Sequence, residues 1–278
     1  MSNRITLLSS ALLPIILVWV FTAPTSHPSN TLQGVTDYNE IIDGRGRYNE
    51  SGGYNESGWI SGNIRSGASS NFDEPRNQVR DEDSFKIARI EYRGGGDWYN
   101  DPSSLTNLID FAVQHIPISI SRKYDDVSIG SRDLHQYPFV FMTGHGNIDV
   151  NSTEAANMRE YLDNGGFLYI DDDYGFDPYV RPVIEKIFPD EELLELPASH
   201  PIYSMVFDLP DGLPKIHEHD GKPPQGFGIF RNGRLVLYYT YESNLADGWA
   251  HDVHDNPEHL TDHSLQMGVN LLVYALTR

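Results

Sequence analysis

Two polar segments carry most of the residues in this chain that can do chemistry. Residues 143–147 read TGHGN and residues 171–174 read DDDY, and each segment directly follows a short apolar run, 139–142 (FVFM) or 167–170 (FLYI). Short apolar runs that end in glycine or in polar residues predict strands buried on both faces. A histidine between glycines is open to a ligand, and adjacent carboxylates can act as general base, metal ligand or hydroxyl acceptor. We therefore expect functional residues in both segments.

The candidate residues form a catalytic set and a binding set. The catalytic candidates are His145, Asp172, Asp173 and His217. The binding candidates are Thr143, Gly144, His145, Gly146, Asn147, Asp171, Asp172, Asp173, Tyr174, Asn244 and Trp249. Several of them also have a structural interpretation: the aspartates can cap the turn that follows, His145 can fix its own loop, and Trp249 can pack on the core.

Further polar residues lie in the C-terminal third. His217 and His219 flank Glu218 at the spacing of one strand face, and two imidazoles with a carboxylate can hold zinc or iron. The spacing fits no defined zinc signature, so we expect no metal or other cofactor. His217 and His219 are the weak candidates for metal ligands. Tyr241, Asn244, Asp247 and Trp249 form a mixture of groups found in sugar sites, whereas His251, His254, His259 and His263 are expected to be exposed.

A predicted helix joins the two polar segments. Asn151 can cap its first turn, with Glu154 three residues later, and the sequence Asn-Gly-Gly at 164–166 ends it. Strand, helix and strand then form a β-α-β unit with parallel strands and a right-handed crossover. Both polar segments lie at the carboxyl ends of these strands, where open α/β sheets bind ligands.

The remaining elements predict an α/β domain over residues 83–278, with an open, mostly parallel sheet and helices on both faces. The expected strands are 85–92, about 118–121, 228–230 and 235–239, the last two joined by an Asn232-Gly233 hairpin turn. The expected helices begin at Asp101-Pro102, with Asp101 as cap, and at Asp177-Pro178, and a last helix spans 264–276.

At these motifs the chain resembles a known family, the domain of unknown function 4159. The resemblance rests on TGHG (143–146), GGFL (165–168) and the aspartates after it, supported by FKIARIEYRGGGDW (85–98), SHPIY (199–203), RNGRL (231–235) and MGVNLLVYALTR (267–278). It covers roughly residues 83–278. It implies a flavodoxin-like fold similar to that of class I glutamine amidotransferases, and it implies no established function.

That resemblance places residues 143–146 at the oxyanion-binding glycines of the amidotransferase fold and 171–175 at the elbow that carries its cysteine. This chain has no cysteine, so the glutaminase reaction is excluded. Two functions stay open. One is a non-catalytic module for a small molecule or an envelope protein, and the other is a hydrolase in which Asp172 or Asp173 activates water with help from His145 and His217.

The net charge of the chain limits the kinds of partner that it can bind. Forty acidic residues stand against twenty basic ones, only five of them lysine, for a formal net charge of -20. Nucleic acids and anionic membrane surfaces are bound through Lys and Arg contacts to phosphate, so the net charge argues against both as partners. The acidity fits either a plain soluble surface or adaptation to salt.

The N-terminal region predicts export. Residues 5–23 are apolar and follow Arg4, which is typical of either a secretory signal peptide or a membrane anchor, and no Lys or Arg follows until Arg45. This charge asymmetry places the remainder outside the cytoplasm, in the periplasm or at the cell surface. Residues 24–82 are rich in Gly, Ser and Asn, with a recurring Tyr-Asn-Glu, and indicate a flexible linker. The predicted domains are therefore 1–23, 24–82 and 83–278.

Overall fold

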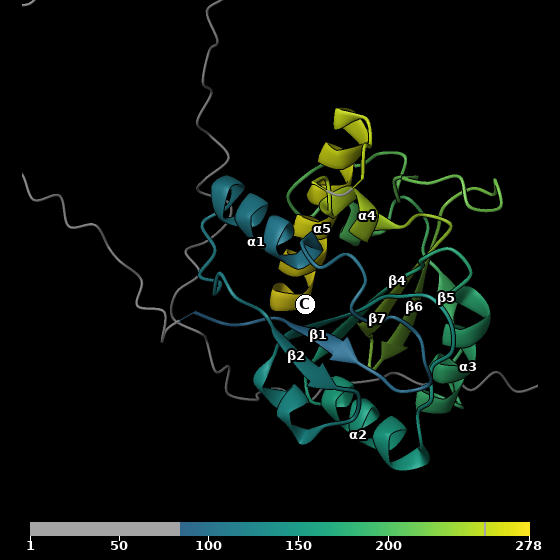
Figure 1. The fold of residues 1–278 in the computed structure, drawn as a ribbon. Helices are drawn as coiled ribbons and strands as arrows, with labels where there is room; N and C mark the ends of the chain where they lie inside the picture. The colour runs from purple at the N-terminus through teal and green to yellow at the C-terminus, as the bar shows by residue number, and fades with distance from the viewer. Residues whose placement is uncertain (1–83, 253) are drawn as a thin grey trace, which may run out of the picture. The chain divides into compact units, whose positions relative to one another are not determined.

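Seven strands form one sheet in the computed structural model, which describes residues 84–252 and 254–278 (Figure 1). The strands are β1 (Ala88–Glu91), β2 (Asp125–Ser128), β3 (Phe139–Met142), β4 (Phe167–Asp171), β5 (Leu194–Glu195), β6 (Gln225–Arg231) and β7 (Arg234–Tyr241). Their order across the sheet is β2-β1-β3-β4-β7-β6-β5. The first five strands in that order are parallel, and β6 and β5 are each antiparallel to the preceding neighbour. The expected open, mostly parallel sheet is confirmed.

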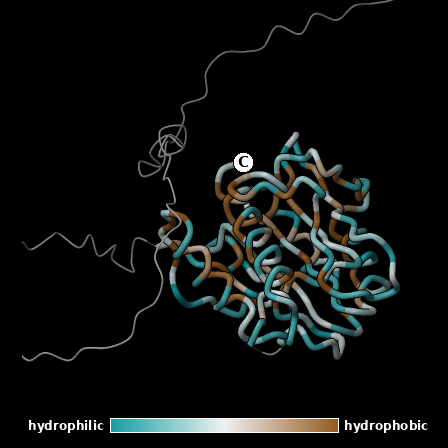
Figure 2. Tube along the Cα trace, turned by 90° about the horizontal axis from the view of Figure 1, so that it is seen from above, coloured by the Kyte–Doolittle hydropathy of each residue, from teal (hydrophilic) through white to brown (hydrophobic). Residues whose placement is uncertain are grey.

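Helices cover both faces of this sheet. They are α1 (Ser104–His115), α2 (Ser152–Asp163), α3 (Asp177–Ile187), α4 (Leu245–Trp249) and α5 (Glu258–Thr277), with 3-10 turns at Arg132–Gln136 and Pro201–Tyr203. Figure 1 shows α1, α4 and α5 on one face and α2 and α3 on the other. Apolar segments gather between these layers, and hydrophilic segments lie at the periphery (Figure 2).

The central β-α-β unit forms as its sequence predicts. β3 and β4 pair in parallel from Phe139 opposite Phe167 to Met142 opposite Ile170. At the start of α2, the Asn151 side chain accepts from the backbone of the first turn while Glu154 reaches back to the Asn151 amide, which completes a capping box. The carboxyl ends of both strands therefore point to the same edge.

The two central strands are apolar throughout because helices cover both of their faces. Every residue of β3 and β4 is buried. Phe139 and Tyr169 belong to the core beneath α1, α4 and α5, whereas Val140 and Ile170 belong to the core above α2 and α3. Alternate side chains thus fill two separate cores, and no position faces water.

The β6–β7 hairpin is confirmed at Asn232-Gly233. Both turn residues have positive φ angles, 53° and 80°, as a type I′ turn requires. The strands extend beyond the expected apolar runs, to Gln225–Arg231 and Arg234–Tyr241, because antiparallel pairing also includes polar residues at their ends.

Three local predictions are wrong. The segment 118–121 makes only a single bridge, Phe85 to Ile120, and the real edge strand is β2, whose sequence DDVS has no apolar pattern because three of its four residues are not buried. Asp101 does not cap α1. It adopts a left-handed conformation with φ 48°, and the cap residue Ser103 makes no side-chain cap bond. Residues 216–219 form no strand.

The predicted apolar segment 5–23 and linker 24–82 lie outside the described residues. Within residues 84–252 and 254–278, no helix has both the length and the apolar content needed to cross a membrane.

Candidate functional site

The chain reverses its winding direction between β1 and β3. The connection from β1 to β2 runs through α1 on one face of the sheet, and the connection from β3 to β4 runs through α2 on the other. A crevice opens at such a point, outside the carboxyl ends of the strands, and it is the usual ligand position in open α/β sheets. The loops after β1, β3, β4 and β7 meet there.

The TGHG loop after β3 is attached to the loop after β1. The Gly96 amide donates to the Asn147 carbonyl at 3.1 Å, the Asp97 amide donates to the His145 carbonyl at 3.1 Å, and the His145 amide donates to the Asp97 carboxylate. Gly144 has φ 127°, and a Cβ on it would lie 2.4 Å from the Tyr92 hydroxyl oxygen. The loop is therefore closely packed, and its most accessible functional group is the half-exposed His145 side chain.

His145, expected to act with Asp172 or Asp173, contacts two carboxylates, those of Asp97 and Asp173. Its Nδ1 lies 3.1 Å from Oδ2 of Asp97 and 3.9 Å from Oδ2 of Asp173. Burial lowers the pKa of His145, but the charge of Asp173 and the hydrogen bond with Asp97 outweigh it, so the pKa is raised. His145 is thus held closer to its cationic form than a free imidazole.

The three consecutive aspartates have three different environments, beginning with Asp171, which is structural. Its fully buried Oδ1 accepts from the Tyr169 hydroxyl at 2.6 Å, the Thr240 hydroxyl at 2.7 Å and the Leu245 amide at 3.0 Å. Its Oδ2 accepts from the Ala246 amide at 2.6 Å. Burial raises the pKa of Asp171 to about 6, opposed by these hydrogen bonds. Asp171 thus holds the start of α4 against β4.

Asp173 joins four loops. Its carboxylate accepts from the side-chain amides of Asn100 and Asn244, both at 2.8 Å, and from the Thr143 hydroxyl at 3.3 Å. Only 1% of Asp173 is exposed, and this burial raises its pKa. The predicted binding residues Thr143 and Asn244 therefore position Asp173, and both are themselves buried.

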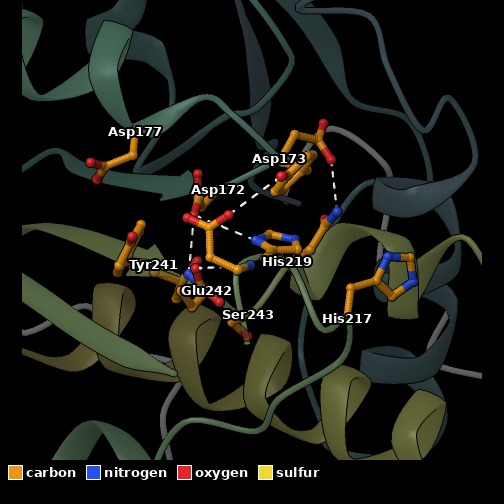
Figure 3. A network of polar contacts seen from close by, with 12 residues as sticks. Asp172, Asp173, Asp177, His217, His219, Tyr241, Glu242 and Ser243 are labelled. Carbon is orange, nitrogen blue, oxygen red and sulfur yellow. Dashed lines mark hydrogen bonds and ion pairs between the residues drawn. The ribbon is translucent and has the colours of Figure 1, made fainter. Parts of the chain in front are cut away.

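Asp172 is the least satisfied of the three. Its Oδ2 accepts from the Glu242 amide at 3.0 Å and lies 3.7 Å from Nδ1 of His219 (Figure 3). In the described part of the chain, two buried side-chain polar atoms have no hydrogen-bond partner. They are Oδ1 of Asp172 and Nε2 of His219. Such an atom costs about 1–3 kcal/mol, so each one calls for an explanation.

Backbone strain concentrates at the same edge. Among residues 84–252 and 254–278, five non-glycine residues have positive φ: Asp101, His219, Asn232, Glu242 and Asn244. Asn232 belongs to the hairpin turn, and the other four lie in loops at the carboxyl edge. Positive φ in a non-glycine residue is costly and tends to occur at functional sites.

Two hollows border His219, and one of them also borders Asp172. One, of about 340 Å³, is lined by Asp172, Tyr174, Gly175, Asp177, Pro178, His219, Asp220, Tyr241 and Glu242. The other, of about 500 Å³, is lined by Tyr174, Ile216, His217, Glu218 and His219. Tyr174, which is 59% exposed, and His219 line both. These volumes suit a small ligand.

A second cluster lies beside the first. Nδ1 of His217 is 3.0 Å from Oδ2 of Asp247, and Nε2 of His254 is 2.8 Å from Asp101 and 3.3 Å from Asp247. Burial and the neighbouring Asp247 carboxyl raise the pKa of Asp101 to about 7. Burial also favours a raised pKa for Asp247, but the hydrogen bond from His217 outweighs it and lowers that pKa, and the same bond raises the pKa of His217.

The structure separates the predicted histidines. His217 joins Asp247 and His254, whereas His219 turns to Asp172, so the pair does not form one strand face. His254 is half-buried, contrary to expectation, whereas His251, His259 and His263 are exposed as predicted.

Trp249 has no exposed surface. Its ring packs against Phe141 and Tyr169, and its Nε1 donates to the Ser264 carbonyl at 2.8 Å, so the core-packing interpretation holds for it. Sequence reasoning did not select Asp97, Asn100 or His254. The position of Asp97 and Asn100 just after the first predicted strand was the available signal, and His254 had none.

Fold and site together define an α/β domain with a cluster of carboxylates and imidazoles at the carboxyl edge of a mostly parallel sheet. Residues 86–276 match the domain of unknown function DUF4159, and the chain belongs to this family. No curated protein matches the chain.

Proposed function

We propose that this domain is a non-catalytic module that binds a small, uncharged, hydroxyl-bearing ligand in the hollow between Asp172, Tyr174 and His219. The observation that carries this proposal is the pair of buried, unpartnered atoms, Oδ1 of Asp172 and Nε2 of His219, in the wall of that hollow. A ligand hydroxyl can donate to the carboxylate oxygen and bond to the ring nitrogen. Both atoms are screened from solvent, so binding includes a small rotation of the His219 ring.

The charges around the hollow disfavour an anionic ligand. Asp172, Asp177, Asp220 and Glu242 line it, and a phosphate or carboxylate would meet these acidic groups. The exposed Tyr174 ring offers an apolar face with a polar tip. A neutral saccharide or polyol combines a face for the ring with hydroxyls for Asp172 and His219.

A binding role also agrees with the state of the elbow after β4. The chain has no cysteine, and hydrogen bonds engage both carboxylate oxygens of Asp171 and of Asp173. We infer that the domain has the class I glutamine amidotransferase-like variant of the flavodoxin-like fold, in which this elbow has lost its nucleophile. The mostly parallel sheet and the position of the elbow after β4 support that assignment.

The binding test uses the full chain and a panel of neutral saccharides and polyols in calorimetric titrations. Asp172→Asn and Tyr174→Ala should each weaken binding at least tenfold with little change in melting temperature. Tyr179→Ala is the matched control, because Tyr179 is also an exposed tyrosine but lines neither hollow. Absence of saturable binding across the panel, or binding that both variants retain, would rule out this function.

A second candidate, a hydrolase, has one specific observation in its favour. Asp97 holds Nδ1 of the half-exposed His145, which is the arrangement by which a carboxylate orients a general base. His145 with Asp173, 3.9 Å away, would then activate water, and Asp172 would bind substrate. Turnover of esters, amides or glycosides that His145→Gln abolishes would establish this function in place of pure binding.

We also propose that the domain works outside the cytoplasm, tethered or released by residues 5–23. The support is the charge pattern, with Arg4 before the apolar segment and no Lys or Arg until Arg45. Alkaline phosphatase fused after Arg278 should be active and a cytoplasm-restricted fluorescent protein dark; the reverse pattern would exclude export.

A further inference from the structure

Three buried aspartates meet next to the proposed ligand site, and histidines are the basic residues that the structure places beside them. Asp101, Asp173 and Asp247 are 3%, 1% and 4% exposed, and one carboxylate oxygen from each lies within 4.8 Å of the others. Among the described residues, no lysine or arginine forms an ion pair with any of the three. Buried carboxylates that repel one another are costly unless a cation or protons neutralise them.

Two histidines complete this cluster from separate loops. His217 lies in the loop before β6, and His254 lies between α4 and α5. Together with Asp247, each offers one ligand atom within 4.8 Å of the others, and Nε2 of His254 is also 2.8 Å from Asp101. The side chains of His217 and His254 are 35% and 30% exposed, so both histidines are in contact with solvent.

We propose that His217, His254 and Asp247 bind one divalent transition-metal ion, with the carboxylate of Asp101 beside it. Two imidazole nitrogens with carboxylate oxygens suit Zn²⁺ or Mn²⁺ better than Ca²⁺ or Mg²⁺, which take oxygen ligands. The ion would replace the hydrogens that link the imidazoles to the carboxylates, and its charge would offset the Asp101–Asp247 repulsion. Asp173 would remain beside the ion, held by Asn100 and Asn244.

This metal site is distinct from the proposed ligand hollow, which Asp172 lines. His217 lines only the other, larger hollow. Figure 3 shows His219 beside Asp172 and His217 apart from that carboxylate. Asp172→Asn and Tyr174→Ala should therefore leave metal affinity unchanged. Failure of the metal proposal and failure of the ligand proposal are separable for this reason.

The test begins with the full chain, stripped with EDTA and dialysed, to which ZnCl₂ or MnCl₂ alone is added in a calorimetric titration. We expect one saturable site per chain, a melting temperature that rises with metal and falls again with EDTA, and visible d–d absorption when Co²⁺ is bound. His217→Ala with His254→Ala should weaken binding at least a hundredfold.

The matched control is the double variant His259→Ala with His263→Ala. These two exposed histidines lie one turn apart on α5, with ring centroids 6.5 Å apart, and they are the competing pair for surface metal binding. The single variant His254→Gln covers the case in which the double alanine variant misfolds. Absence of saturable binding in the unmodified chain, or binding that the control variant abolishes and His254→Gln retains, would overturn the proposal.

Discussion

The substitution Asp171→Ala separates a structural aspartate from its two neighbours. Asp171 is fully buried and accepts four hydrogen bonds, two from side-chain hydroxyls and two from backbone amides at the start of α4. Alanine leaves all four donors without this acceptor in a site closed to water. At a net value of about 1 kcal/mol for each bond, the expected loss is about 4 kcal/mol of unfolding free energy.

That loss would be a large part of the stability of a domain, which is typically about 5–15 kcal/mol. For a domain of this size it corresponds to a melting temperature lower by about 8–16 °C. Urea unfolding of the full chain, followed by far-UV circular dichroism, measures the change in free energy directly. Asp190→Ala is the control, because Asp190 is exposed in the turn after α3 and should change stability by less than about 0.5 kcal/mol.

The companion variant Asp172→Asn keeps the size of the side chain and an oxygen for the Glu242 amide. It should cost less than about 1 kcal/mol, because one of the two oxygens of Asp172 has no partner to lose. A structural role for Asp171 is contradicted if Asp171→Ala lowers the free energy of unfolding by less than about 1 kcal/mol, or if Asp172→Asn lowers it more than Asp171→Ala does.

Three further predictions concern the neighbouring loops and the core. By NMR, His145 should titrate above its ordinary pKa of 6.5. Because the folded pKa is raised, the stability that His145 contributes should be complete below pH 6.5 and lost as pH rises through the folded value, and Asp97→Asn should lower its midpoint. Gly144→Ala should lower stability by more than about 2 kcal/mol, because its Cβ would lie 2.4 Å from the Tyr92 hydroxyl oxygen, whereas Gly95→Ala, at φ 96° with open space around it, should cost only about 1 kcal/mol; urea titrations decide between them. Trp249→Ala should cost about 3–5 kcal/mol in the same assay as a core truncation, and a cost below about 1 kcal/mol would contradict its burial.

The central part of the fold was predictable because local and tertiary signals agree there. A few residues are enough to predict each of three features there: the buried strands β3 and β4, the Asn151 capping box and the Asn232-Gly233 turn. β2 could not be found in this way. Its sequence DDVS becomes a strand because it pairs with β1 along its full length, and only Val127 is buried.

The site was predictable by location but not by pairing. The rule that ligands bind at the carboxyl ends of parallel strands selected the segments at 143–147 and 171–174. The sequence left Asp172 and Asp173 as alternatives beside His145, and the fold brings Asp173 to within 3.9 Å of it. The contact with Asp97 could not be predicted, because it depends on how the loop after β1 folds over the loop after β3. His254 follows α4 in a loop with no sequence motif, so only the folded chain brings it to Asp101.

The junction at Asp173 has a consequence for how binding would be detected. Its carboxylate ties together loops that follow four strands, so a ligand or ion that tightens it would restrain β1, β3, β4 and β7 at once. Slower hydrogen exchange should therefore appear in backbone amides across the sheet as well as beside the ligand. Conversely, cleavage of the chain within any one of these loops would disrupt the site while much of the secondary structure persists. Ligand or ion binding at the site would therefore show that all four loops are in place.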